Sequence, residues 1–366
     1  MPNKIVDTKN LVTEKRKEKI FFGDYSGFQR YDNPTYKFAV LQEERQRNAF
    51  WNPNEISMQN DAQRFFELPE PMQEVMIRIW LFQTLMDSGQ NSGLEGILAE
   101  MATNTEFEAM FKTWGYFELI HSISYSHLLR GIFSDASKIF DKIGGYPEIQ
   151  HRIDKEIDLY SQVKNIDEIE DDTEKKKLLL ELLVSVFALE GIKFYVSFLV
   201  TYIINNAYGN KIQGATRIIK LINFDEDIHT TMGNGLLNIL EKEKSEGFSE
   251  IMSSDWYSTM VEQTFRQVYT DELEWAEYLL NIGDIPSLTR GVIDQFLKYF
   301  VDMRCSQLGQ PKIYNQEKTD VVQWFENYKN LNKDNAALQE SDLAVYSIGI
   351  MKNDIPEGPL DLNIGN

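Results

Sequence analysis

The sequence predicts an all-α protein, folded as one bundle of long helices, on two observations. From about residue 71 onward, apolar residues recur at intervals of three and four, as in Val75, Ile79, Phe82 and Met86, whereas the alternation typical of strands is scarce. No linker rich in Pro, Gly or Ser divides the middle of the 366-residue chain. Predicted helices longer than about 25 residues favour a bundle of long crossing helices over a compact globin-like packing.

Seven segments carry the helical pattern, and two terminal segments lie outside it. The expected helices cover residues 68–100, 103–133, 146–165, 174–208, 211–243, 254–282 and 286–308. We expect an N-terminal segment at 1–25, the helical domain at 26–315 and a flexible C-terminal tail at 316–366. The tail is too polar to build a core of its own, so it is expected to be mobile.

Composition excludes several classes of protein. A formal net charge of −20 opposes binding to nucleic acid, and no basic stripe offsets it. The most apolar run, at 178–204, resembles a membrane span, but Glu181, Glu190 and Lys193 interrupt it, which favours a buried helix. The charged N-terminus does not read as a signal peptide and Cys305 is the only cysteine, so a cytoplasmic protein without an internal disulfide is expected.

One motif occurs twice, on two different predicted helices. Glu118 and His121 are three residues apart, and so are Glu226 and His229. Side chains at i and i+3 project from the same face of a helix, so each pair can direct two ligands to one point. A single Glu-x-x-His is usually a solvated pair or a capping interaction. Two such motifs, using half of the four histidines, indicate a metal site.

Two further carboxylates lie in apolar helices. They are Asp87 in "WLFQTLMDSGQ" and Glu190 in "SVFALEGIKF". Burial of either one alone would cost several kcal/mol unless it were neutralised, paired or metal-bound. Asp87 by itself could equally be a polar residue near a helix bend. Taken together, four carboxylates and two imidazoles suit two iron or manganese ions better than zinc or calcium.

A tyrosine lies close to the first motif. Tyr125 follows His121 by one helical turn, about 6 Å along the axis, on the same face. A core tyrosine with a partnered hydroxyl is the ordinary interpretation of any one phenol. Phe194, Phe198 and Ile222 lie one or two turns from Glu190 and Glu226, and together they could exclude water from an oxidised phenol.

The segments "LFQTLMDS", "ELIHSISYSHLLR", "ALEGIKFYVSF" and "KLINFDEDIH" occur in an order and spacing that resemble a known family. The sequence is similar to the small, radical-generating subunit of class I ribonucleotide reductase, from about residue 50 to 308. The resemblance implies a ferritin-like bundle with two Fe ions (Mn possible), activated by O₂, and Tyr125 as the radical tyrosine. It implies these metal ligands: Asp87, Glu118, His121, Glu190, Glu226 and His229.

The resemblance also suggests stations for moving the radical out of the bundle, namely Trp51, Asp225 and Tyr346. Asp225 makes physical sense as a carboxylate that orients His121, because metal-bound histidines commonly donate their second N–H to such a group. Its alternative is a helix-surface charge. Trp51 could equally be a core aromatic residue and Tyr346 an exposed residue without a role, so these two depend mainly on the resemblance.

Partners follow from the same resemblance. Nucleotide reduction in this class needs a thiyl radical and a reducing thiol pair, which a chain with one cysteine cannot supply, so the chemistry must belong to a large catalytic subunit. We expect a homodimer whose tail docks on that subunit through Leu360, Leu362 and Ile364. The implied activity is that of ribonucleoside-diphosphate reductase in deoxyribonucleotide biosynthesis for DNA replication. Two alternatives are a ferritin-like oxidase or monooxygenase of small organic substrates, and an iron-storage bundle.

Overall fold

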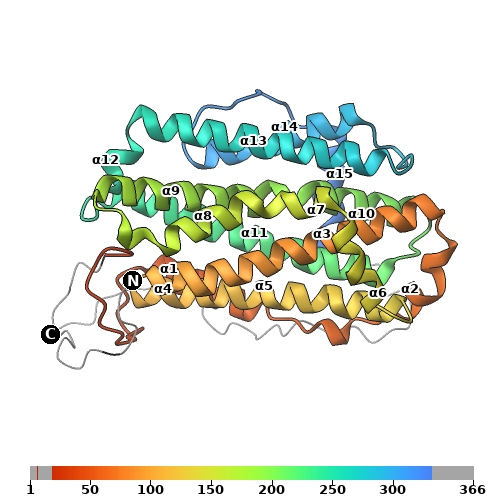
Figure 1. The fold of residues 1–366 in the computed structure, drawn as a ribbon, viewed down its shortest axis with the longest axis horizontal. Helices are drawn as coiled ribbons and strands as arrows, with labels where there is room; N and C mark the ends of the chain where they lie inside the picture. The colour runs from red at the N-terminus through yellow and green to blue at the C-terminus, as the bar shows by residue number, and fades with distance from the viewer. Residues whose placement is uncertain (1–5, 7–18, 332–366) are drawn as a thin grey trace, which may run out of the picture.

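The structure is a computed structural model that describes residue 6 and residues 19–331, which form helices and no strand (Figure 1). The α-helices are α1 (Lys37–Asn48), α2 (Gln59–Arg64), α3 (Glu70–Gly93), α4 (Ala99–Met101), α5 (Thr105–Ile132), α6 (Ser137–Phe140), α7 (Pro147–Gln150), α8 (Asp154–Lys164), α9 (Asp172–Ala188), α10 (Tyr195–Ala207), α11 (Gln213–Lys242), α12 (Phe248–Met252), α13 (Asp255–Leu280), α14 (Arg290–Gln307) and α15 (Asp320–Tyr328).

Short segments of other helical types connect them. The 3₁₀ helices are η1 (Pro53–Glu55), η2 (Phe65–Glu67), η4 (Asp141–Gly145), η5 (His151–Ile153) and η6 (Ile166–Glu168), and the two π-helices are η3 (Leu94–Leu98) and η7 (Leu189–Lys193). A π-turn accommodates one extra residue, which changes the direction of the side chains that follow it. Each π-helix lies inside a longer helical run, η3 between α3 and α4 and η7 between α9 and α10.

All seven predicted helical segments are present. Two of them are interrupted by the π-helices, and the segment expected at 146–165 is divided into α7, η5 and α8. The prediction missed α1, α2, α6, α12 and α15. Four of these have fewer than ten residues, and the exception, α1, buries only Ala39 and Gln46, so it lacks a wide apolar face.

Polar residues define where the site-bearing helices begin. The side chain of Asn104 accepts hydrogen bonds from the backbone N–H of Glu106 (3.1 Å) and Phe107 (3.0 Å) at the start of α5. At the start of α11, the carboxylate of Asp61 from α2 accepts from the N–H groups of Gly214 and Ala215, both at 2.8 Å. These contacts satisfy backbone donors that a helix leaves unpaired at its N-terminus.

The long helices lie roughly side by side in layers, as Figure 1 shows. One layer contains α1, α3 and α5, a middle layer contains α8, α9, α10 and α11, and α13 and α14 cover the opposite side. Contacts link α3 to α5, α5 to α11, and α9 to α11 and α13. The core between these layers holds large side chains that are fully buried, including Trp80, Trp114 and Trp275.

The packed region extends beyond the predicted limits of 26 and 315. Ile20 and Phe21 are buried, and both of their backbone N–H groups donate to the carboxylate of Glu246. Within the expected tail at 316–366, the structure forms the packed helix α15, in which Phe325 is fully buried against the rings of Tyr195 and Phe296. Residues 343–366, with the predicted docking residues, lie outside the described residues.

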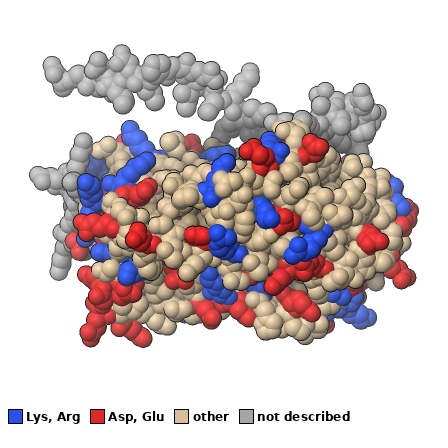
Figure 2. Space-filling view, turned by 90° about the horizontal axis from the view of Figure 1, so that it is seen from above, with Lys and Arg blue, Asp and Glu red and all other residues tan. Residues whose placement is uncertain are grey.

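The run at 178–204 belongs to a buried helix, as predicted. Within the described residues, the continuous helical stretch Asp172–Ala207 has the length and apolar character of a membrane span, but its most apolar window lies entirely inside the protein. Acidic and basic side chains are interspersed over the face shown in Figure 2, and no basic patch stands out there.

Candidate metal centre

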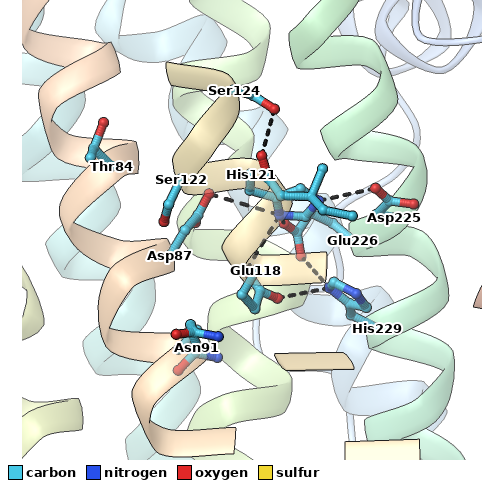
Figure 3. Close-up of polar contacts among 12 residues, drawn as sticks. Thr84, Asp87, Asn91, Glu118, His121, Ser122, Ser124, Asp225, Glu226 and His229 are labelled. Atoms are coloured by element: carbon cyan, nitrogen blue, oxygen red, sulfur yellow. Dashed lines mark hydrogen bonds and ion pairs between the residues drawn. The ribbon is translucent and has the colours of Figure 1, made fainter. Parts of the chain in front are cut away.

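The predicted ligands converge at the middle of the bundle from four helical segments. Asp87 comes from α3, the first Glu-x-x-His pair from α5 and the second from α11 (Figure 3). Glu190 lies in the π-helix η7. All of the following side chains have no exposed surface: Asp87, Glu118, His121, Glu190, Glu226 and His229. The sequence prediction that these six residues lie together, away from solvent, is confirmed.

The six side chains form two overlapping groups of ligand atoms. Within each group, one atom from every residue lies within 4.8 Å of the others. The first group contains Asp87 and His121, the second contains Glu190 and His229, and both include Glu118 and Glu226. Since a carboxylate has two oxygens, the two shared residues can each contact both positions. This arrangement is typical of two metal ions bridged by carboxylates.

Both histidines present Nδ1 to the carboxylates. His121 Nδ1 lies 3.3 Å from Glu118 Oε2 and 3.4 Å from Glu226 Oε1. His229 Nδ1 lies 3.0 Å from Glu118 Oε1 and 3.4 Å from Glu190 Oε2. The i, i+3 spacing accounts for the contact between Glu118 and His121, whereas the other three contacts join different helical segments.

The pKa values of three of these carboxyl groups shift in different directions: those of Asp87 and Glu226 rise, and that of Glu118 falls. Burial, followed by the charge of Glu118, raises the pKa of Asp87 well above its usual value, and burial with Glu190 raises that of Glu226. Burial acts in the same direction on Glu118, but the nearby imidazoles outweigh it and hold its pKa at about 2. Without additional positive charge, the protein alone therefore disfavours the ionised forms of Asp87 and Glu226.

The unpaired atoms fit a pair of cations. Within the described part of the chain, no hydrogen bond reaches Asp87 Oδ1 and Oδ2, Glu118 Oε2, His121 Nδ1, Glu190 Oε2 or Glu226 Oε1. Buried polar atoms are almost always paired, so a cluster of this kind requires an explanation. Hard oxygen donors combined with imidazole nitrogen suit iron or manganese, so the residues present fit a dimetal site.

Tyr125 is buried beside this cluster. Its pKa is raised well above the usual value by burial and by the nearby Asp87 and Glu226 carboxyls, so the phenol stays protonated at neutral pH. Phe194, Phe198 and Ile222 are also fully buried, and the two phenylalanine rings stack with centroids 5.8 Å apart. The three apolar residues that the sequence places near the site are thus part of the buried core.

Asp225 lies behind His121, and it is fully buried, which excludes the alternative of a surface charge. Its Oδ2 lies 3.0 Å from His121 Nε2 and accepts a hydrogen bond of 2.8 Å from Trp51 Nε1. Its Oδ1 accepts from Gln46 Nε2 at 2.9 Å. A continuous chain of hydrogen bonds therefore leads from Trp51 to the imidazole of His121.

Sequence reasoning missed several side chains that contact this set, among them Gln46 and Trp114. Gln46 lies on α1, a helix that the apolar pattern does not reveal. Trp114, whose Nε1 donates to Glu118 Oε1 at 3.2 Å, precedes Glu118 by four residues, so helical spacing could have identified it. His127 and His151 do not enter the site: His127 contacts the backbone carbonyl of Ile56 and His151 pairs with Asp154. Tyr346 lies outside the described residues.

Comparison with known proteins agrees with the motifs. The profile of the family described as "Ribonucleotide reductase, small chain" matches residues 31–322. The chain belongs to this family. The small chain is 30% identical to the ribonucleoside-diphosphate reductase subunit beta of Buchnera aphidicola subsp. Baizongia pistaciae, over 94% of this chain and 95% of that protein. It is 29% identical to the ribonucleoside-diphosphate reductase 1 subunit beta of Salmonella typhimurium, over 95% of each.

Solved structures share the fold of this small chain. The ribonucleotide reductase R2 subunit from Clostridium botulinum superposes with a TM-score of 0.80 at 22% identity, covering 90% of this chain and 99% of that one. The dimanganese(II)-NrdF of Streptococcus sanguinis gives a TM-score of 0.66 at 21% identity, covering 84% and 100%. The predicted ferritin-like helical class is confirmed.

Proposed function

We propose that this small chain is the radical-generating subunit of a cytoplasmic ribonucleoside-diphosphate reductase. Its dimetal centre would use O₂ to oxidise Tyr125, and the radical would pass to a large catalytic subunit that reduces ribonucleotides to deoxyribonucleotides. The observation that carries the proposal is the pair of buried ligand groups sharing Glu118 and Glu226, with Tyr125 beside them. Family membership favours this function over the oxidase and storage alternatives.

Asp87 and His121 would hold one ion, Glu190 and His229 the other, and the two shared glutamates would contact both. When bound, a pair of iron or manganese ions together with O₂ supplies the oxidising power that the protein's own side chains lack. The donor types serve either metal.

The protein's contribution at Tyr125 is protection and position. Because the phenol stays protonated, its oxidation to a neutral radical removes a proton together with the electron. The buried phenylalanines and Ile222 keep water and reductants away from the oxidised ring. Trp51 and Asp225 would then form the outward path, since their hydrogen bonds connect to His121, and Tyr346 would continue this path toward the partner.

A second copy of the chain is the expected partner at α5. Tyr116, Leu119 and Ile123 are each more than two-fifths exposed and succeed one another at intervals of three and four. They therefore form an apolar stripe along one helix, of the kind that a homodimer covers.

The test of the radical site is Tyr125→Phe, which removes one oxygen atom. The variant is expected to bind two metal ions per chain and to show no tyrosyl signal in electron paramagnetic resonance after loading and O₂ exposure. Tyr257→Phe is a matched control, because Tyr257 is another buried tyrosine whose hydroxyl has no hydrogen-bond partner in the described residues. A tyrosyl signal that survives Tyr125→Phe would show that the radical lies elsewhere.

The docking role of the tail is tested with two further variants. Truncation after Asp342 is expected to retain the radical and to lose both binding to the large subunit and turnover. Tyr346→Phe is expected to retain binding and lose turnover only. Full ribonucleotide reduction by the truncated chain would contradict the proposed role of residues 343–366.

A further inference from the structure

A row of polar side chains on α8 and the preceding η5 faces the segment that carries Glu190. Arg152, Glu156 and Tyr160 follow one another at intervals of four residues, so they lie along one helical face. Glu156 and Tyr160 are at most 6% exposed. None of these residues belongs to the ligand set, and the proposed radical chemistry assigns them no role.

Tyr160 reaches the metal centre through one intermediate residue. Its hydroxyl donates to Gln90 Oε1 at 3.0 Å, and Gln90 Nε2 donates to Glu190 Oε1 through a short hydrogen bond. Gln90 is 1% exposed and lies three residues after Asp87 on α3. The relay therefore connects α8, α3 and η7, which three separate parts of the sequence supply.

The relay distinguishes the two oxygens of Glu190. Oε1 is occupied by Gln90, whereas Oε2 faces the ligand group and lies 3.4 Å from His229 Nδ1. The amide of Gln90 is held in one orientation, because its Oε1 accepts from Tyr160 and only its Nε2 can then face the carboxylate. Glu190 is thus oriented to offer a single oxygen to an ion.

A second contact fixes the spacing between the same two segments. Lys193, at the end of η7, donates to Glu156 Oε1 at 2.5 Å and to the backbone carbonyl of Arg152 at 3.4 Å. Lys193 is 2% exposed, and the Glu156 carboxylate is its partner in this buried ion pair. α8 is therefore linked to η7 at two points, directly through Glu156–Lys193 and through Gln90 of α3 by Tyr160–Gln90–Glu190.

The backbone at Gly93 and at Glu190 allows this arrangement. A Cβ atom at Gly93 would lie 2.1 Å from the ring of Tyr160, so only glycine lets the ring lie against the end of α3. Glu190 itself sits in a π-turn, whose wider backbone ring departs from ordinary α-helical spacing and is held here by contacts from outside the helix.

We propose that Gln90 and Tyr160 are positioning residues that hold Glu190 as a one-oxygen ligand, and so control the affinity and exchange of the ion that Glu190 and His229 bind. This inference depends on the proposed dimetal function. Partners of metal ligands typically contribute about 10- to 100-fold in metal affinity, and an effect in this range is expected here.

The experiment titrates the full-length, metal-free chain with Mn(II), using the electron paramagnetic resonance signal of the free ion, and then follows Mn(II) release to a chelator. Tyr160→Phe and Gln90→Leu are each expected to weaken binding of one of the two ions by about 10-fold or more and to speed its release, with the other ion unchanged. Tyr257→Phe is again the matched control and is expected to behave as the wild type. Tyr160→Phe removes only one oxygen, so it carries the test if Gln90→Leu does not fold.

The double variant separates a relay from two independent effects. Because Tyr160 acts through Gln90, adding Tyr160→Phe to Gln90→Leu is expected to cause little further loss of affinity. Equal losses in the two backgrounds, or wild-type affinity and release in Tyr160→Phe, would overturn the inference while leaving the dimetal function intact. A wild-type chain that binds fewer than two Mn(II) ions would overturn both.

Discussion

Substitution of Asp225 by Asn tests the carboxylate behind His121. The variant removes a charge and keeps the shape. Asp225 Oδ2 serves both Trp51 and His121, so the remaining oxygen of Asn must take that position and its NH₂ group must face Gln46. Gln46 can turn its amide over to accept, because its Oε1 makes no hydrogen bond in the described residues. The fold should therefore tolerate the change.

The expected effect of Asp225→Asn is a lower affinity for the metal ion at His121. Hydrogen bonds to charged groups contribute about 1.5–3 kcal/mol and neutral ones about 0.5–1.5 kcal/mol, so the bond to His121 weakens by roughly 1 kcal/mol. Affinity for the ion at His121 should then fall about 5- to 10-fold, near the lower end of the range for such partners. Asp225→Leu should lose more, because it leaves three buried donors without an acceptor. Mn(II) titration of the metal-free chain measures both.

Gln46→Met is the control for the turned amide of Gln46. In Gln46→Met the NH₂ group of an Asn at position 225 has no acceptor, so the double variant should be less stable than the two single changes predict, by about 1–3 kcal/mol. Urea unfolding of the metal-free chain measures this difference. Additive stabilities, or an Asp225→Asn chain with wild-type metal affinity, would refute the reasoning.

Three further outcomes are expected. Phe325→Ala should lower the free energy of unfolding by about 3–5 kcal/mol in urea, because the ring is fully buried among aromatic residues. Burial, opposed by Arg152 and Lys193, raises the pKa of Glu272 from 4.5 to about 7. The raised pKa therefore stabilises the fold by on the order of 3 kcal/mol below pH 4.5, and this contribution is lost as the pH rises to about 7. Because Gln does not titrate, the free energy of unfolding of Glu272→Gln should rise relative to that of the wild type over this pH range in urea titrations. Leu119→Glu should yield monomers in sedimentation, whereas an unchanged dimer would exclude the α5 stripe.

The long helices and the two Glu-x-x-His pairs were predictable because both depend on short-range spacing. An apolar period over more than 20 residues identifies α5 and α11, and the Glu-x-x-His spacing fixes which side chains share a face. Contacts between segments that are distant in the sequence produce no such periodic pattern. Gln46 and Tyr160 are ordinary polar residues in the sequence, and only the packing of α1 and α8 brings them to the site.

The π-helices mark a second limit of sequence reasoning. The segment at 174–208 has a helical pattern throughout, and nothing in its periodicity reveals the wider turn at η7. The wider turn nevertheless surrounds Glu190 and ends at Lys193, which is paired with α8. For α15 the missing signal is length, because nine residues carry too few apolar positions to distinguish a packed helix from a polar tail.

Three consecutive acidic residues on α11 lie in three different environments. Successive helical residues point about 100° apart, so Asp225, Glu226 and Asp227 face different neighbours. Asp225 faces His121, Glu226 faces the ligand groups, and Asp227 accepts from Lys329, just beyond α15, at 2.7 and 2.8 Å. Each carboxylate thus has its own source of positive charge or donors, which limits the repulsion that adjacent acids would otherwise impose on the helix. Lys329, near the end of the described residues, thereby pairs with the residue next to a predicted metal ligand.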